Sequence, residues 1–85
     1  MNLNNIDYKM LADLLETDPN HDVFNKMATS RRYSYKFALY LMDKNLEVPE
    51  IILQSIAKYA SDSYDFAHHL MKNNQEVPDI IAQGV

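Results

Sequence analysis

Residues 35–56 read YKFALYLMDKNLEVPEIILQSI, and residues 64–85 repeat this pattern as YDFAHHLMKNNQEVPDIIAQGV. The two segments align at an offset of 29 residues, with the aromatic, Leu-Met and Val-Pro positions in register. A period of this size is typical of stacked helical units, each of which is too small to bury its own apolar face. The sequence therefore predicts a helical repeat.

A third and weaker copy precedes these two. Residues 11–15 have the spacing Leu-Ala-x-x-Leu, which matches Phe-Ala-x-x-Leu at residues 37–41. The apolar pairs within residues 23–28 likewise match those within residues 52–57. We interpret the chain as one all-α domain, a small stack of three antiparallel helix pairs. The domain spans residues 1–85, and the repeats cover about 5–30, 34–60 and 63–85.

Turn residues and apolar periodicity indicate where the first helices begin and end. Asn4 or Asn5 is expected to cap the first helix, and residues 17–19, Thr-Asp-Pro, to end it and begin the second. Arg31 and Arg32 are expected to end the second helix, where their charge suits the negative end of the helix dipole.

The later helices follow from the repeated segments. The third is expected over residues 34–44, and Asn45 is expected to end it in the left-handed conformation. The fourth is expected to open at Pro49 and to be followed by a turn at residues 61–63. The last two predicted helices are a fifth over residues 64–73 and a short sixth from Pro78. We thus expect five helices plus a short C-terminal sixth.

The composition excludes several kinds of site. The 85 residues are 47% hydrophobic and 24% charged, as in a small globular domain. The chain has no cysteine, which excludes disulfides, thiolate zinc sites and a cysteine nucleophile, and its single glycine excludes a phosphate-binding glycine loop. It has no run of about 20 apolar residues. We therefore expect no membrane segment and a cytoplasmic location.

The repeated motif Tyr-x-Phe-Ala-x-x-Leu-Met, followed by Glu-Val-Pro-Glu/Asp-Ile-Ile, resembles a known kind of repeat. It is similar to the short tandem helix-pair repeats of uncharacterised bacteriophage and mobile-element proteins. The resemblance covers residues 34–85 well and residues 5–30 poorly. It implies a scaffold of stacked helices and a phage or mobile-element origin. It implies no activity, and no site residue is carried over from it.

The charges are unevenly distributed along the chain. The net charge is −4, but residues 31–60 carry five bases against three acids, between two acidic ends. Within this middle part, residues 31–36 read Arg-Arg-Tyr-Ser-Tyr-Lys. Alternating bases and aromatic rings are typical of single-stranded nucleic-acid binding. Arg and Tyr are also enriched among the anchors of protein interfaces, and a purely structural role in capping and packing is a third reading.

His68 and His69 replace Leu39 and Tyr40 of the preceding copy. We interpret this polar change as the outward side of the terminal unit. Adjacent helical residues point about 100° apart, so the two histidines cannot chelate one metal ion together. Asp65 with His69, four residues apart, is the usable combination. We predict no metal, no cofactor and no catalytic residue.

The hypothesis from the sequence is a small non-enzymatic protein-binding module that modulates a host or defence protein. The alternative is nucleic-acid binding through residues 31–36. The candidate partner-binding residues are Arg31, Arg32, Tyr33, Lys36, Tyr40, His68 and His69. We also expect a homodimer, because Ile80, Ile81 and Val85 form a truncated apolar turn, whereas the ends of repeat arrays are normally polar.

Overall fold

The computed structural model describes residues 7–84, and in this part of the chain every regular element is a helix. The predicted all-α fold is therefore confirmed. The helices are α1 (Tyr8–Thr17), α2 (Asp22–Ala28), α3 (Arg31–Asp43), α4 (Glu50–Ala57), α5 (Ala60–Lys72) and α6 (Asp79–Gly84). We call α1–α2, α3–α4 and α5–α6 the first, second and third pairs. That they are copies of one repeated unit stays an interpretation of the sequence. Asn4, Asn5 and Val85 lie outside the described residues.

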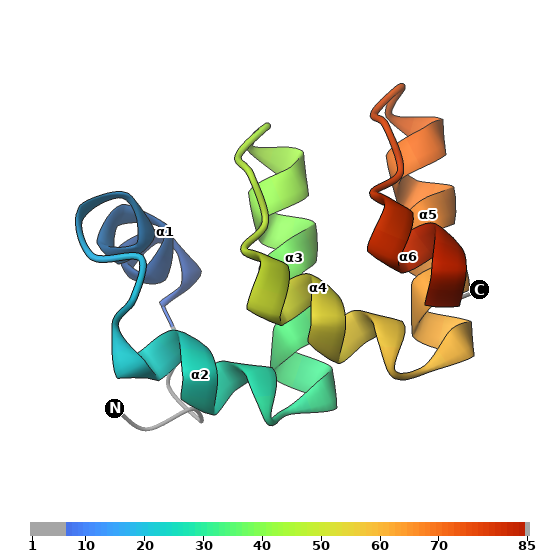
Figure 1. Ribbon diagram of the computed structural model, residues 1–85. Coiled ribbons are helices and arrows are strands. Elements are labelled where there is room, and N and C mark those ends of the chain that lie inside the picture. The colour runs from blue at the N-terminus through green and yellow to red at the C-terminus, as the bar shows by residue number, and fades with distance from the viewer. Residues whose placement is uncertain (1–6, 85) are drawn as a thin grey trace.

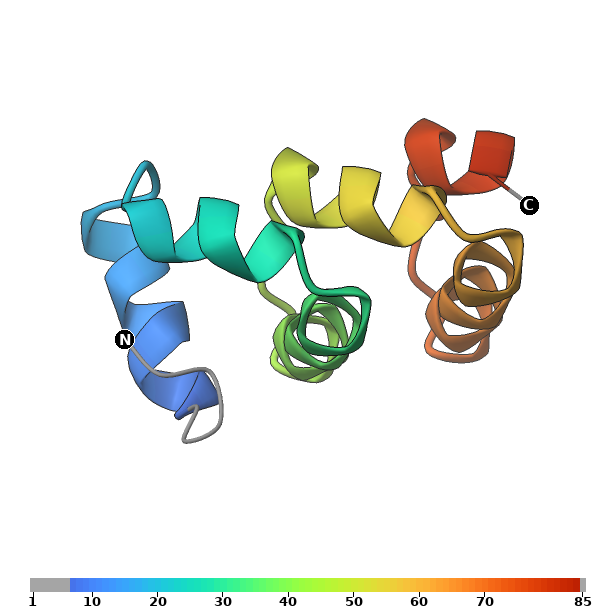
Figure 2. The same cartoon turned by 90° about the horizontal axis from the view of Figure 1, so that it is seen from below.

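The helices lie in two layers (Figures 1 and 2). In one layer α3 contacts α1 and α5, and in the other α4 contacts α2 and α6. Figure 2 shows α3 and α5 nearly end-on but α2 and α4 from the side, so the second helices lie across the first ones. The result is a short stack, 31 × 23 × 20 Å, with α1 at one end and α5 and α6 at the other.

The same turn links the two helices in the second and third pairs. Asn45 has φ 57° and Asn74 has φ 58°, so both lie in the left-handed region. The residue after each Asn donates its backbone N–H to the carbonyl of Leu41 or Leu70, at 2.8 Å in both turns. This is the hydrogen bond of a Schellman cap. The prediction for Asn45 is confirmed, and the turn fixes where the following segment leaves the helix.

The core lies between the two layers and runs the length of the stack. The Phe37 side chain is fully buried, and its ring lies 6.2 Å from the Tyr8 ring and 6.1 Å from the Phe24 ring, centroid to centroid. The Phe66 ring lies 6.3 Å from the Tyr35 ring. The buried apolar residues are Leu11, Ala12, Val23, Phe24, Met27, Phe37, Ala38, Leu41, Met42, Ile52, Ile56, Phe66, Leu70 and Ile81. Phe37 thus joins the first pair to the second, and Phe66 joins the second to the third.

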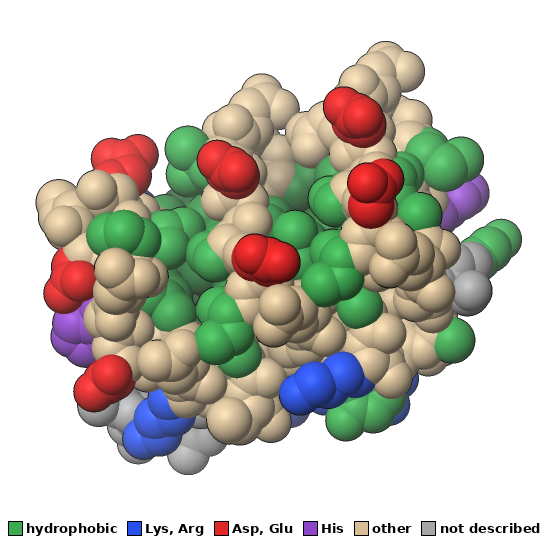
Figure 3. Space-filling model, viewed as in Figure 1, with side chains coloured by type: hydrophobic (Ala, Val, Ile, Leu, Met, Phe, Trp, Pro, Cys, Tyr) green, Lys and Arg blue, Asp and Glu red, His purple; other side chains and the backbone are tan. Residues whose placement is uncertain are grey.

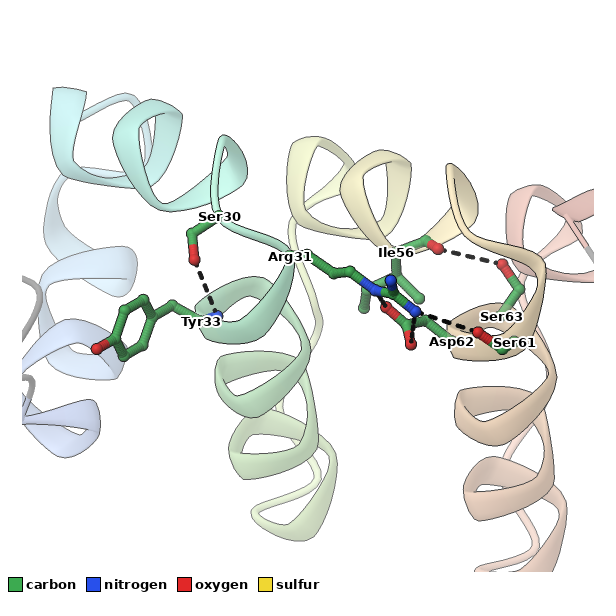
Figure 4. Close-up of polar contacts among 7 residues, drawn as sticks. All are labelled: Ser30, Arg31, Tyr33, Ile56, Ser61, Asp62 and Ser63. Atoms are coloured by element: carbon green, nitrogen blue, oxygen red, sulfur yellow. Dashed lines mark hydrogen bonds and ion pairs between the residues drawn. The ribbon is translucent and has the colours of Figure 1, made fainter.

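Two buried serines connect consecutive pairs. Ser34 donates its Oγ hydrogen to the Met27 carbonyl at 2.9 Å, and Ser63 donates to the Ile56 carbonyl at 3.3 Å (Figure 4). Both serines have no exposed surface. A buried hydroxyl needs such a partner to offset its lost hydration. The bonds therefore hold the start of α3 against the end of α2, and the start of α5 against the end of α4.

Three predicted boundaries were wrong. Arg31 and Arg32 begin α3 rather than end α2, because Ser30 caps α3 by accepting the Tyr33 N–H at 3.3 Å. The dipole argument therefore does not apply to these arginines. Residues 61–63 lie in the first turns of α5, and α2 starts at Asp22, three residues after Pro19.

The start of α2 has a cap that the sequence pattern did not suggest. The side chain of His21 accepts the Val23 N–H at its Nδ1 atom, 3.1 Å away. Asp18, which was expected to cap α2, instead follows the last residue of α1 and donates its N–H to the Leu14 carbonyl at 2.7 Å. A histidine cap was missed because Asp and Pro are the commoner start signals.

Candidate functional site

The Arg31 side chain binds other residues of the same chain (Figure 4). Its Nε lies 2.7 Å from Asp62 Oδ2, its Nη2 lies 3.1 Å from Asp62 Oδ1, and Nη2 also donates to Ser61 Oγ at 3.2 Å. The guanidinium lies 4.2 Å from the centroid of the Tyr59 ring. The hydrogen bond to Asp62 raises the pKa of the Arg31 side chain. Arg31 thus links the second and third pairs. No sequence pattern indicated this contact, because Arg31 and Asp62 are 31 positions apart.

The tyrosines of the predicted site pack against α1. The Tyr40 ring stacks on the Tyr8 ring at 6.0 Å, and both Tyr33 and Tyr40 are half-buried. Burial raises the pKa of the Tyr8 hydroxyl, and the nearby Tyr33 raises it further. The Arg32 guanidinium lies 6.0 Å from the Tyr33 ring. These rings therefore stabilise the contact between the first and second pairs, and their faces are partly covered.

The exposed side of α3 keeps several basic side chains. Arg32 and Lys36 are exposed, and Lys44 lies with its ammonium 5.8 Å from the Tyr40 ring. Arg32, Lys36, Tyr40 and Lys44 are spaced four residues apart, so they follow one side of the helix surface. The structure thus divides the predicted segment 31–36: Arg32 and Lys36 face solvent, while Arg31 binds Asp62.

His68 and His69 are both exposed. They lie on α5, whereas Arg32 and Lys36 lie on α3. The His68 ring stacks on the Tyr64 ring at 6.5 Å. The His69 carbonyl accepts the Asn73 Nδ2 hydrogen at 2.8 Å. Within residues 7–84 no three His, Asp or Glu side chains come together as metal ligands would. The polar exposure predicted for this pair of histidines agrees with the structure.

The outer side of the third pair carries an exposed apolar surface. Tyr64 is 60% exposed and Met71 is 63% exposed, whereas Met42, the residue aligned with Met71, is only 3% exposed. Together with neighbouring side chains they surround a hollow of about 410 Å³. We call this the end surface; its lining residues are Tyr64, Ala67, His68, Met71, Val77 and Ala82.

The predicted self-association residues need correction. Ile81 is fully buried within the chain and Ile80 is half-buried, while Val85 is outside the described residues. Ile81 occupies the position of Ile52 in the repeat alignment, and Ile52 is fully buried too. The α6 helix therefore turns this side chain inward. The apolar surface at this end comes chiefly from α5. The sequence signal for it was that Tyr64 and Met71 keep the residue types of Tyr35 and Met42 in the preceding copy.

Two neighbouring grooves lie on the face that carries the starts of α4 and α6. The first has a volume of about 370 Å³, lies between α1 and residues 46–50, and is lined by Leu15, Val48, Glu16, Glu47 and Glu50 among others. The second has about 290 Å³ and lies between residues 46–48 and 75–78, with Leu53, Phe66, Glu47 and Glu76 in its lining. Figure 3 shows acidic side chains spread around a hydrophobic hollow on this face.

The turn that leads into the segment between the two grooves is bonded to the third pair. Gln75 donates its Nε2 hydrogens to the Met42 carbonyl at 3.2 Å and to Asn45 Oδ1 at 3.1 Å. Glu47 lines both grooves, so it stands on the wall that separates them. Sequence reasoning missed these grooves, although the repeated Glu-Val-Pro-Glu/Asp motif contains all of their acidic residues except Glu16. The two grooves thus combine apolar lining residues with carboxylates at their edges.

None of the helices found in residues 7–84 has the length and apolar character needed to cross a membrane. Comparisons of the chain with protein families, with curated proteins and with solved structures found no match.

Proposed function

We propose that this chain is a non-enzymatic protein-binding module. The observation that supports it is the pair of adjacent grooves, each with an apolar floor and an acidic rim, on one face of the stack. Binding sites combine apolar surface with a few polar groups that set orientation. His68 and His69 are exposed: the His68 ring stacks on Tyr64 in the lining of the end surface, and the His69 carbonyl accepts the Asn73 side chain near the end of α5.

The partner we propose is a host or defence protein met in the cytoplasm. The likeness of the repeated motif to phage and mobile-element repeats supports this choice, and the absence of cysteine fits a reducing compartment. The chain is small and acidic, and such a module can act by covering a functional surface on another protein. Its effect would then be inhibition or modulation of that protein.

Affinity capture from a bacterial lysate tests this proposal with two matched variants. The groove variant carries Glu47→Lys and Glu76→Lys, which reverse charges on the rims. The control variant carries Asp43→Lys and Asp65→Lys, which make the same change in net charge elsewhere. Lys72 and Lys36 already occupy the aligned positions, so the control introduces residues that the fold accepts. A protein retained by the native and control chains but lost from the groove variant supports the proposal; equal retention by all three overturns it.

We also propose that two copies associate through the end surface. The corresponding surface of the second pair, which includes Tyr35 and Met42, is covered by α5 and α6 of the same chain. The end surface is the equivalent surface on the third pair, and a two-fold contact would set it against the same surface of a second copy and bury Tyr64 and Met71 of both copies. Light scattering should then report a molar mass near twice 9.9 kDa, and Met71→Glu should return it to 9.9 kDa. A mass of 9.9 kDa for the unmodified chain refutes the dimer.

Nucleic-acid binding is the second candidate function. Exposed Arg32 and Lys36 on one side of α3 favour it, while the pairing of Arg31 with Asp62 removes one base from the site. If this function holds, Arg32→Ala with Lys36→Ala should weaken binding to a single-stranded oligonucleotide, and native affinity should fall steeply with salt. Absence of binding at about 50 mM salt would remove this candidate.

A further inference from the structure

We infer that the two grooves bind a positively charged, extended segment of the partner protein, with one apolar side chain in each groove and lysines or arginines against the rims. This inference rests on the proposed protein-binding function and names the chemistry of the partner. Three properties of the grooves carry it: the charge of the rims, the spacing of the grooves and their size.

Charge is the first property. Glu47 and Glu76 are aligned in the repeat, and Glu16 and Glu50 add two more carboxylates to the first groove. All four are exposed, and no Lys or Arg lines either groove. Figure 3 shows Lys and Arg side chains only toward the lower edge of this face. A ligand with positive charge is therefore attracted here, whereas a phosphate backbone is repelled.

Spacing is the second property. Packed helices lie about 8–10 Å apart, so equivalent points on neighbouring pairs are separated by about that distance. A polyproline II chain rises about 3.1 Å per residue with three residues per turn, which places every third side chain on the same side about 9 Å along. An extended ligand with an apolar residue at every third position can therefore fill both grooves in succession.

Groove size is the third property. Volumes of about 370 and 290 Å³ accept individual side chains, and residues 46–48 stand between the two grooves. An α-helix with its side chains is about 10–12 Å across, so it would rest on the rims and leave apolar lining residues such as Leu15 and Leu53 uncovered. The extended chain is consequently the better fit, with its basic residues free to meet the carboxylates on either side.

A synthetic peptide provides the test. The probe is a fluorescent peptide of about twelve residues made of Leu-Lys-Pro triplets, which favours the polyproline II conformation. Its control replaces every lysine with glutamate. Binding is followed by fluorescence anisotropy to the native chain, to the groove variant Glu47→Lys with Glu76→Lys, and to the control variant Asp43→Lys with Asp65→Lys. Circular dichroism establishes that all three proteins are folded.

We expect the lysine peptide to bind the native and control chains alike, and the groove variant about tenfold more weakly or worse. Binding should weaken as salt rises, and the glutamate peptide should not bind. Equal affinity for the groove and control variants overturns the inference, as does equal binding of both peptides.

The outcomes also separate this inference from the proposed function. If no peptide binds, but a lysate protein is captured by the native chain and not by the groove variant, the proposal of protein binding stands. The inference of a basic, extended ligand then fails. If neither experiment distinguishes the groove variant from its control, both proposals fail.

Discussion

Met42 and Met71 offer a sharp test of how the pairs are packed. The two residues are aligned in the repeat and both follow a buried leucine, yet Met42 is 3% exposed and Met71 is 63% exposed. The difference arises because α5 and α6 cover the second pair, while no described element covers the third. Truncation to alanine should therefore have very different consequences at the two positions.

The magnitudes follow from burial. Replacing a buried methionine by alanine typically costs about 2–5 kcal/mol, because transfer energy is lost and a cavity remains. Met42 borders the second groove, so part of that cavity opens to solvent and we expect a loss of about 2–3 kcal/mol. Exposed sites normally change stability by within about 0.5 kcal/mol, and alanine's helix propensity offsets some of the loss at Met71. A chain of 85 residues has about 4–13 kcal/mol to lose, so both variants should remain folded.

Urea denaturation followed by circular dichroism measures both changes. We expect the free energy of unfolding to fall by at least about 1.5 kcal/mol more for Met42→Ala than for Met71→Ala. The measurement should be made at low protein concentration, where self-association through the end surface contributes least. Equal losses at the two positions would show that the third pair does not cover the second as described.

Three further predictions concern single positions. Asn74→Ala should lower stability by about 1–2 kcal/mol, because φ is 58° there, whereas Asn74→Gly should leave it nearly unchanged; urea midpoints distinguish the two. Gly84→Ala should destabilise the protein by about 1–3 kcal/mol, although alanine has the better helix propensity, because the new Cβ would lie 2.6 Å from Ser63 Oγ. A gain in melting temperature would contradict this prediction. Burial and then the Asp65 and Asp62 carboxylates raise the pKa of Tyr35 above 10.0, so the native state holds its proton longer than the unfolded chain. Stability should therefore fall as pH rises above about 10, and less steeply in Tyr35→Phe, as urea midpoints at several pH values would show.

The candidate sites illustrate where sequence reasoning stops. Arg31 and Arg32 are adjacent and chemically alike, so no local pattern tells them apart. Their environments differ because Asp62, from the third pair, binds Arg31 and not Arg32. The same holds for Ile80 and Ile81, of which only the second is fully buried. Such assignments depend on contacts between residues about 30 positions apart, which a helical period does not encode.

The sequence by itself determined the class of fold and the turn at Asn45. Apolar periodicity and the recurrence of residues 35–56 predicted an all-α chain, and Asn45 marked a turn through its local tolerance of the left-handed conformation. Only the tertiary structure decided which of two identical side chains is covered and where grooves form. Met42 and Met71 occupy the same position of the Phe-Ala-x-x-Leu-Met motif, but burial depends on what packs against a helix, and that neighbour is described for one and not for the other.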